Sequence, residues 1–164
     1  MSLLYLDTAI ENFATTISKQ VLGHVYHRPD PASYPTYCIN NVLGYIQING
    51  GRIRYGWTFH YRTNEDFGDY LFATHHAVWQ GLDGYLIDVT PFHQDVKHHP
   101  ITNDGSIVFL VDDLAQPLKK DNKIIPLPLK FFAIQNDAEL EKYLDRLRKK
   151  EMRDYIDNHG IYIT

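Results

Sequence analysis

The feature that most constrains this chain is a series of strand-like segments that begins directly after Gly50-Gly51. Residues 52–62 alternate polar and aromatic side chains, as a strand with one buried face does. Residues 70–80 form a second such run, and the Gly81-Leu82-Asp83-Gly84 sequence after it is a strong turn signal. Residues 85–90 then predict a third strand. The middle of the chain therefore predicts an antiparallel sheet.

Helical patterns precede and follow this sheet. Residues 38–48 predict a helix that starts at Cys38, after a loop at 28–37 that contains three prolines. A C-terminal helix is predicted over 136–158, with Asn136 or Asp137 as its cap and Leu140, Tyr143, Leu144 and Leu147 as its apolar stripe. Residues 7–25 also predict a helix, capped by Asp7, with the apolar stripe Ile10, Phe13, Ala14, Ile17 and Val21.

Two further strands are predicted, at 106–111 and at 123–135. Pro126 and Pro128 cannot donate to a ladder, so they favour an edge position for part of the second strand. We find no internal repeat and no low-complexity linker. The order helix, helix, antiparallel sheet, helix predicts an α+β fold, and the length of 164 residues predicts a single domain over 1–164.

Composition narrows the functional classes. A net charge of −4 argues against a nucleic-acid partner held by phosphate contacts. The single cysteine allows no internal disulfide, which fits a reducing compartment. The first residues do not resemble a signal peptide, and no run of eighteen apolar residues predicts a membrane span. We therefore expect a cytoplasmic protein without a membrane partner.

Cys38 is the first candidate for chemistry. A free cysteine often acts as a small buried hydrophobe. Here a proline-rich loop precedes it, a helix is predicted to begin at it, and a glycine pair ends that helix. A thiol in the first turn of a helix meets the positive end of the peptide dipoles, which favours the nucleophilic thiolate.

His76 and Asp88 form the second candidate pair. They have the same parity across the predicted hairpin, so a three-residue loop at 81–83 would place them directly opposite each other on one face. A turn at Asp83-Gly84 would change this register, and an odd shift would separate the two faces. A carboxylate beside an imidazole fixes its tautomer and stabilises its charged form, so Cys38, His76 and Asp88 together fit covalent catalysis by a thiol.

Several motifs occur in an order that is similar to a pattern in small bacterial proteins, some of which accompany SEC-C metal-binding motifs: Cys38-Ile39-Asn40-Asn41-Val42, Gly50-Gly51, Gly56-Trp57, His76-Ala77-Val78-Trp79, Asp83-Gly84 and Asp88-Val89-Thr90-Pro91. More broadly, a His-Ala-x-Trp strand followed by an Asp-x-Thr-Pro strand resembles the transglutaminase-like branch of the papain-like superfamily. The resemblance covers roughly residues 36–91.

This resemblance implies a papain-like or transglutaminase-like core, with the nucleophile helix packed on an antiparallel sheet. It implies Cys38 as nucleophile, His76 as base and Asp88 as the residue that orients the imidazole. The reaction would be hydrolysis or acyl transfer at an amide or related acyl carbon of a peptide, protein or small amide. Peptidase, deamidase and acyltransferase outcomes share the first step of this reaction.

The sequence departs from the papain-like pattern because the loop at 28–37 lacks the glutamine that often helps to build an oxyanion hole. Backbone N–H groups at the helix start would have to replace it. Our further candidates for substrate binding or for the oxyanion hole are Asn41, Trp57, Trp79 and His75.

Two alternative functions remain open. His93, His98, His99 and His60 indicate a metal-binding protein, and Cys38, His76 and Asp88 are also legitimate zinc ligands. Their spacing matches no ordinary zinc template, so we expect neither a metal nor another cofactor. The other alternative is an inactive papain-like module that serves in interactions. The oligomeric state is not readable from the sequence.

Overall fold

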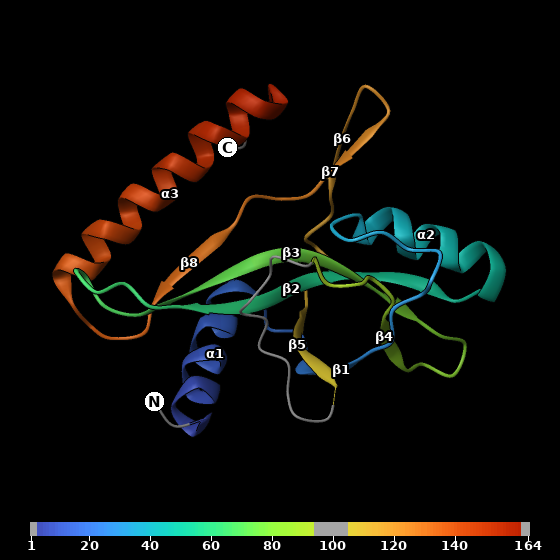
Figure 1. The fold of residues 1–164 in the computed structure, drawn as a ribbon, viewed down its shortest axis with the longest axis horizontal. Helices are drawn as coiled ribbons and strands as arrows, with labels where there is room; N and C mark the ends of the chain where they lie inside the picture. The colour runs from blue at the N-terminus through green and yellow to red at the C-terminus, as the bar shows by residue number, and fades with distance from the viewer. Residues whose placement is uncertain (1–2, 94–104, 162–164) are drawn as a thin grey trace.

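The computed structural model describes residues 3–93 and 105–161, which form a mixed α+β structure (Figure 1). In chain order the elements are α1 (Leu3–Ile17), β1 (Leu22–His27), α2 (Cys38–Asn49), β2 (Arg52–Arg62), β3 (Tyr70–Gln80), β4 (Leu86–Asp88), β5 (Ser106–Val111), β6 (Leu118–Lys120), β7 (Lys123–Ile125), β8 (Lys130–Ala133) and α3 (Ala138–His159). No helix in the described ranges is long and apolar enough to cross a membrane.

The main sheet closes on itself. Its strand order is β2-β5-β1-β4-β3-β8, and β2 also pairs with β3, so the first five strands form a small barrel and β8 extends it beyond β3. β1 is parallel to β4, whereas the other pairings are antiparallel. β6 and β7 form a separate two-stranded ribbon, which projects from the sheet in Figure 1.

The long β2–β3 hairpin is the longest paired segment of the barrel. Its ladder is in register from Arg52 opposite Gln80 to Arg62 opposite Tyr70. On its other side β3 pairs with β8 along 70–73 and with β4 at 79–80. In the described chain, residues 74–78 of β3 therefore have a strand neighbour on one side only.

Gly56 allows the barrel to close. It lies opposite both His76 on β3 and Val111 on β5. A Cβ at this position would lie 1.9 Å from the Leu110 carbonyl oxygen. A side chain is excluded there, so β5 can pack closely against β2 only because this residue is glycine.

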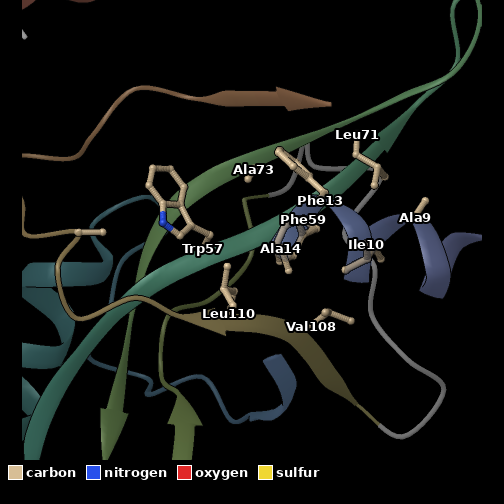
Figure 2. Packing of buried hydrophobic residues seen from close by; sticks show 11 residues of the cluster. Ala9, Ile10, Phe13, Ala14, Trp57, Phe59, Leu71, Ala73, Val108 and Leu110 are labelled. Atoms are coloured by element: carbon tan, nitrogen blue, oxygen red, sulfur yellow. The ribbon is translucent and has the colours of Figure 1, made fainter. Parts of the chain in front are cut away.

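Two helices, α1 and α2, cover the outward face of the sheet, and α3 packs on the opposite face of β3 and β8. From α1, Phe13 and its apolar neighbours pack on outward-facing residues of β2, β3 and β5, including Trp57 and Leu110 (Figure 2). From α2, Val42 packs on Ala77. From α3, Leu140 and Leu144 pack against Tyr70 and the β8 strand.

The inward face of β3 changes character along its length. Tyr70 belongs to the α3 cluster at one end, and Val78 belongs to the barrel interior with Val25 and Phe109 at the other. Between them, on the same face, lie Thr74 and His76. A polar section thus separates two apolar clusters, at the part of β3 that lacks a second strand neighbour.

Most predicted elements are confirmed, including the helix at 38–48, the strands at 52–62, 70–80 and 106–111, and the C-terminal helix, which Asp137 caps. The helix predicted at 7–25 instead spans Leu3–Ile17, so Asp7 lies within the helix and is not its cap, and the prediction is wrong beyond Ile17. Val25 is buried in a strand between β4 and β5, and Val21 is exposed. Strand pairing on both sides of β1 therefore outweighs the apparent helical periodicity.

The predicted strand at 123–135 is also wrong in its middle. It is two short strands, β7 and β8, separated by residues 126–129. Pro126 and Pro128 lie in this break, and neither can donate a backbone hydrogen bond. The predicted strand at 85–90 is shorter than expected and is limited to Leu86–Asp88. The β6 strand was not predicted.

Candidate active site

A cavity of about 290 Å³ lies at the polar section of β3. Its walls come from the start of α2, from the inward face of the β2–β3 hairpin and from the segment that follows β4. The lining residues are Thr36, Cys38, Thr58, His60, Thr74, His75, His76, Asp88, Thr90, Pro91, Phe92, His93 and Ile107. The three residues predicted as catalytic therefore line one cavity.

Cys38 is the first residue of α2 and is half-buried. The N-cap residue Tyr37 makes no side-chain capping hydrogen bond. The first N–H groups of a helix have no partner within the helix, so this helix start presents backbone donors beside the thiol. Thr36, two residues earlier, has a φ of 71°, which is a strained value for a β-branched residue.

The loop before Cys38 is anchored to the strand that carries Asp88. The Arg28 and Asp30 N–H groups donate to the carbonyl oxygens of Asp88 and Val89, both at 2.9 Å. The chain runs from this anchor through the prolines to the start of α2. The anchor therefore helps to hold the thiol in position relative to the Asp88 carboxylate.

Asn41 also holds this loop. Its amide nitrogen donates to the Tyr34 carbonyl at 2.7 Å and to the Thr90 hydroxyl at 3.1 Å, and its amide oxygen accepts from the Tyr34 N–H at 3.1 Å. Both N–H donors of the amide are thus occupied. Asn41 fixes the loop against the end of β4, and this geometry gives no support to its predicted oxyanion role.

His76 and Asp88 lie on one face, as predicted, although the register differs from the expected one. The β3–β4 ladder ends at Trp79 opposite Ile87, so its register would set Asp88 against residue 78 and not against His76, just beyond the paired residues. The shift is two residues, and an even shift keeps both side chains on the same face. The Gly81 N–H donates to the Tyr85 carbonyl at 3.0 Å, so the turn encloses residues 82–84 and not the expected 81–83.

The contact between the two side chains is an ion pair. His76 Nε2 lies 3.0 Å from Asp88 Oδ1, with the imidazole side chain 15% exposed and the carboxylate 2% exposed. Nε2 makes no well-aligned hydrogen bond within the described residues. Asp88 Oδ1 also accepts from the Thr90 N–H at 3.2 Å, which fixes the carboxylate.

The charge state of His76 follows from this pairing. Burial lowers the pKa of the imidazole, but the Asp88 charge, the contact with its carboxylate and the nearby Cys38 thiol raise it. The net effect is a His76 pKa well above its ordinary value. This direction favours the imidazolium form of His76, which can stabilise a thiolate at Cys38.

His75 is committed to the fold. Its Nδ1 accepts from the Leu127 N–H at 3.0 Å, so its Nε2 carries the proton and donates to the Ala115 carbonyl at 2.6 Å. Burial lowers the pKa of this imidazole. Both ring nitrogens bind backbone groups, so neither is available for the predicted contact with a substrate.

The two tryptophans predicted to bind substrate lie outside the cavity lining. Trp57 is 1% exposed, packs against α1 and donates to Asp112 at 3.0 Å. Trp79 packs with the α2 cluster and donates to the Gly50 carbonyl at 2.7 Å. In this structure both are packing residues with satisfied indole N–H groups.

The sequence analysis missed Thr58 and Thr74 on the inward face of the hairpin, and treated His60 only as a possible metal ligand. The sequence could have revealed them, because all three have even numbers in their strands, as His76 does, and so lie on the same face of the hairpin. Tyr55 was also missed. Tyr55 packs on the same apolar cluster as Cys38, and burial, followed by the neighbouring Cys38, raises the pKa of its phenol.

The predicted histidine cluster falls partly outside the described residues, since His98 and His99 belong to the segment 94–104. His93 lines the cavity. Within residues 3–93 and 105–161, no group of three or more His, Cys, Asp or Glu side chains is arranged to hold a metal ion.

Comparisons with protein-family models, with curated proteins and with solved structures found no match. The assignment of a function therefore depends on the geometry of the cavity and on the chemistry of its side chains.

Proposed function

We propose that this protein is a thiol-dependent hydrolase or acyl transferase that acts on an amide or related acyl bond of a peptide, protein or small amide. Cys38 is the nucleophile, His76 transfers the proton and Asp88 orients the imidazole. The observation that carries the proposal is the His76–Asp88 ion pair of 3.0 Å in a cavity that Cys38 also lines. Nucleophile, base and orienting group are the components of covalent catalysis.

In the proposed reaction the Cys38 thiolate attacks the carbonyl carbon. The oxyanion that forms accepts hydrogen bonds from backbone N–H groups at the start of α2. His76 gives its proton to the leaving nitrogen, the C–N bond breaks, and a thioester remains on Cys38. Water or an amine then attacks the thioester, and the neutral imidazole accepts its proton. The C–S bond breaks, which releases the acyl product and restores the Cys38 thiolate.

The arrangement of elements supports a papain-like or transglutaminase-like relationship. In such a core a nucleophile at a helix start faces a histidine on an antiparallel sheet. Here Cys38 begins α2, which packs on the β2–β3 hairpin that carries His76. The sheet that carries His76 is the closed one with strand order β2-β5-β1-β4-β3.

The test is the alkylation rate of Cys38, which is the single cysteine of the chain. A free thiol with a pKa of about 8.5 is almost wholly protonated at about pH 6. Because the His76 imidazolium stabilises the thiolate, we expect iodoacetamide to alkylate Cys38 at that pH about 10-fold faster than N-acetylcysteine, or faster still, as followed by intact-protein mass.

Matched variants give the test its specificity. His76→Ala should remove most of the rate advantage and Asp88→Asn part of it, whereas the exposed controls His24→Ala and Asp83→Asn should leave it unchanged. Each variant is first shown to be folded by circular dichroism. A slow parent whose Cys38 reacts faster in the His76 and Asp88 variants would identify a packing cysteine, and the protein would then be an inactive module.

A further inference from the structure

A chain of polar side chains leads from His76 along the inward face of the β2–β3 hairpin. Gly56, opposite His76, has no side chain, so the next pair along this face is Thr58 opposite Thr74. Their hydroxyl oxygens are 2.6 Å apart, and the Thr74 oxygen is 3.0 Å from His60 Nε2. Residues two apart on a strand are separated by roughly 7 Å, so the Thr58–Thr74 pair lies about that far along the hairpin from His76. A small chemical group bound at the reacting atoms could span this distance.

This polar chain is deeply buried. Thr58 is 6% exposed and His60 is 5% exposed, yet both line the cavity. A hydroxyl offers one donor and two acceptor positions. Among the described residues Thr74 is the hydrogen-bond partner of the Thr58 hydroxyl, so that hydroxyl retains unused capacity at the end of the chain.

The chain can present either polarity at Thr58. When Thr74 donates to Thr58, the Thr58 proton is left for a ligand. When Thr58 donates to Thr74, the Thr58 hydroxyl has only acceptor positions left. A group that both donates and accepts, such as an alcohol, fits this end in both states.

The charge of the cavity limits what it binds. Its described lining contains no Lys, Arg or Glu, and the one carboxylate, Asp88, is paired with His76. A second ionised group would lose its hydration without gaining a counter-charge. A volume of about 290 Å³ is at the small end for a ligand site, which fits a short acyl group.

We propose that Thr58 and Thr74 form the acyl-binding subsite, and that it selects a short, uncharged acyl chain with a hydroxyl on its third carbon. From the carbonyl carbon to such a hydroxyl, and on through one hydrogen bond, the reach is roughly 6 Å. That matches the step from His76 to the threonine pair. The inference rests on the proposed function, because it places the acyl group on Cys38.

The test uses p-nitrophenyl esters of 3-hydroxybutyrate, butyrate and succinate. The Cys38 sulfur forms a bond to the acyl carbon, the C–O bond breaks, and nitrophenolate leaves with the bonding electrons. The release of nitrophenolate and the mass of the acylated chain give the rate of acylation. We expect the 3-hydroxybutyryl ester to react about 10-fold faster than the butyryl ester, and the anionic succinyl ester to react slowest.

Thr58→Val should equalise the 3-hydroxybutyryl and butyryl rates, because it removes the hydroxyl that distinguishes the two acyl groups. Thr58→Ser, which keeps the hydroxyl, should retain the preference, and the exposed control Thr63→Val should not alter it. If Thr58→Val does not fold, the relative rates of the three esters in the parent protein still test the inference. Equal rates for the two neutral esters, or a succinyl rate equal to the butyryl rate, overturn this inference.

The two proposals fail in different ways. If none of the esters acylates Cys38 in the parent protein, the proposed function is wrong. If Cys38 is acylated but the acyl preference is absent, or is unchanged in a folded Thr58→Val variant, the proposed function stands and the subsite assignment is wrong.

Discussion

At the scale of single residues, the His76–Asp88 pair makes a defined prediction about stability and pH. The pKa of His76 is raised in the folded protein, so the imidazole binds its proton more tightly there than in the unfolded chain. This contribution to the free energy of unfolding is complete below the unfolded-state pKa of about 6.5, and it is lost as pH rises through the raised folded-state pKa.

We therefore expect the parent to exceed His76→Gln in unfolding free energy by more at pH 6 than at pH 9, as measured by urea titration. Both proteins carry Cys38→Ser in this experiment, so that titration of the thiol does not contribute. A His76 difference that grows with pH would contradict the prediction.

The same pair shows how far sequence reasoning reaches at a single site. Parity alone predicted that His76 and Asp88 share a face, and that prediction is confirmed although the register was wrong by two residues. Parity cannot reveal which neighbours occupy a polar group. The two hydrogen-bond partners of His75, Ala115 and Leu127, lie 40 and 52 residues later in the sequence. No local pattern predicts such contacts.

At the scale of elements, the closing contact between β2 and β5 depends on Gly56. Replacing it with alanine places a methyl group against the Leu110 carbonyl. We expect Gly56→Ala to lower the free energy of unfolding by about 3 kcal/mol or more, because two backbone segments would have to separate. Urea denaturation of the purified variant measures this loss.

Gly23→Ala is the matched control for this prediction. Gly23 also lies in a barrel strand, but an added Cβ would meet nothing within 4 Å. Glycine inside a strand carries an entropic cost, so this change should be neutral or should stabilise the protein by up to about 1 kcal/mol. Equal losses for the two variants would show that barrel closure does not depend on space at Gly56.

The elements that were predicted correctly are those whose pattern is local. The alternation of β2 and β3, and the cap and apolar stripe of α3, can be read from a few neighbouring residues. β1 could not be read in this way. Its six residues follow a helix closely and continue its apolar spacing, and what makes them a strand is pairing with β4 and β5, which lie more than sixty residues later.

At the scale of the whole molecule, the site exists because two apolar clusters do not meet. On the inward face of β3, the α3 cluster ends at Phe72 and the barrel interior begins at Val78. Among the described residues, the intervening section has a strand neighbour on one side only, and the start of α2 and the segment after β4 enclose it. This arrangement follows from closure of the barrel, which no single segment of the sequence encodes.

Closure of the barrel also predicts how stability is distributed over the molecule. All six residues of β5 are buried, and the strand has neighbours on both sides in β1 and β2. Within residues 3–93 and 105–161, β6 and β7 pair only with each other, and a two-stranded ribbon is marginally stable by itself. Opening the ribbon therefore costs less than opening the barrel.

We expect native-state hydrogen exchange to separate these two regions. Amides of β5 should exchange only through global unfolding, and those paired between β6 and β7 should exchange at least about 100-fold faster after correction for intrinsic rates. Low urea should accelerate exchange in β5 with the slope of global unfolding and leave the ribbon nearly unaffected, because local opening exposes little surface. Equal protection in β5 and in the ribbon would mean that the ribbon unfolds together with the barrel.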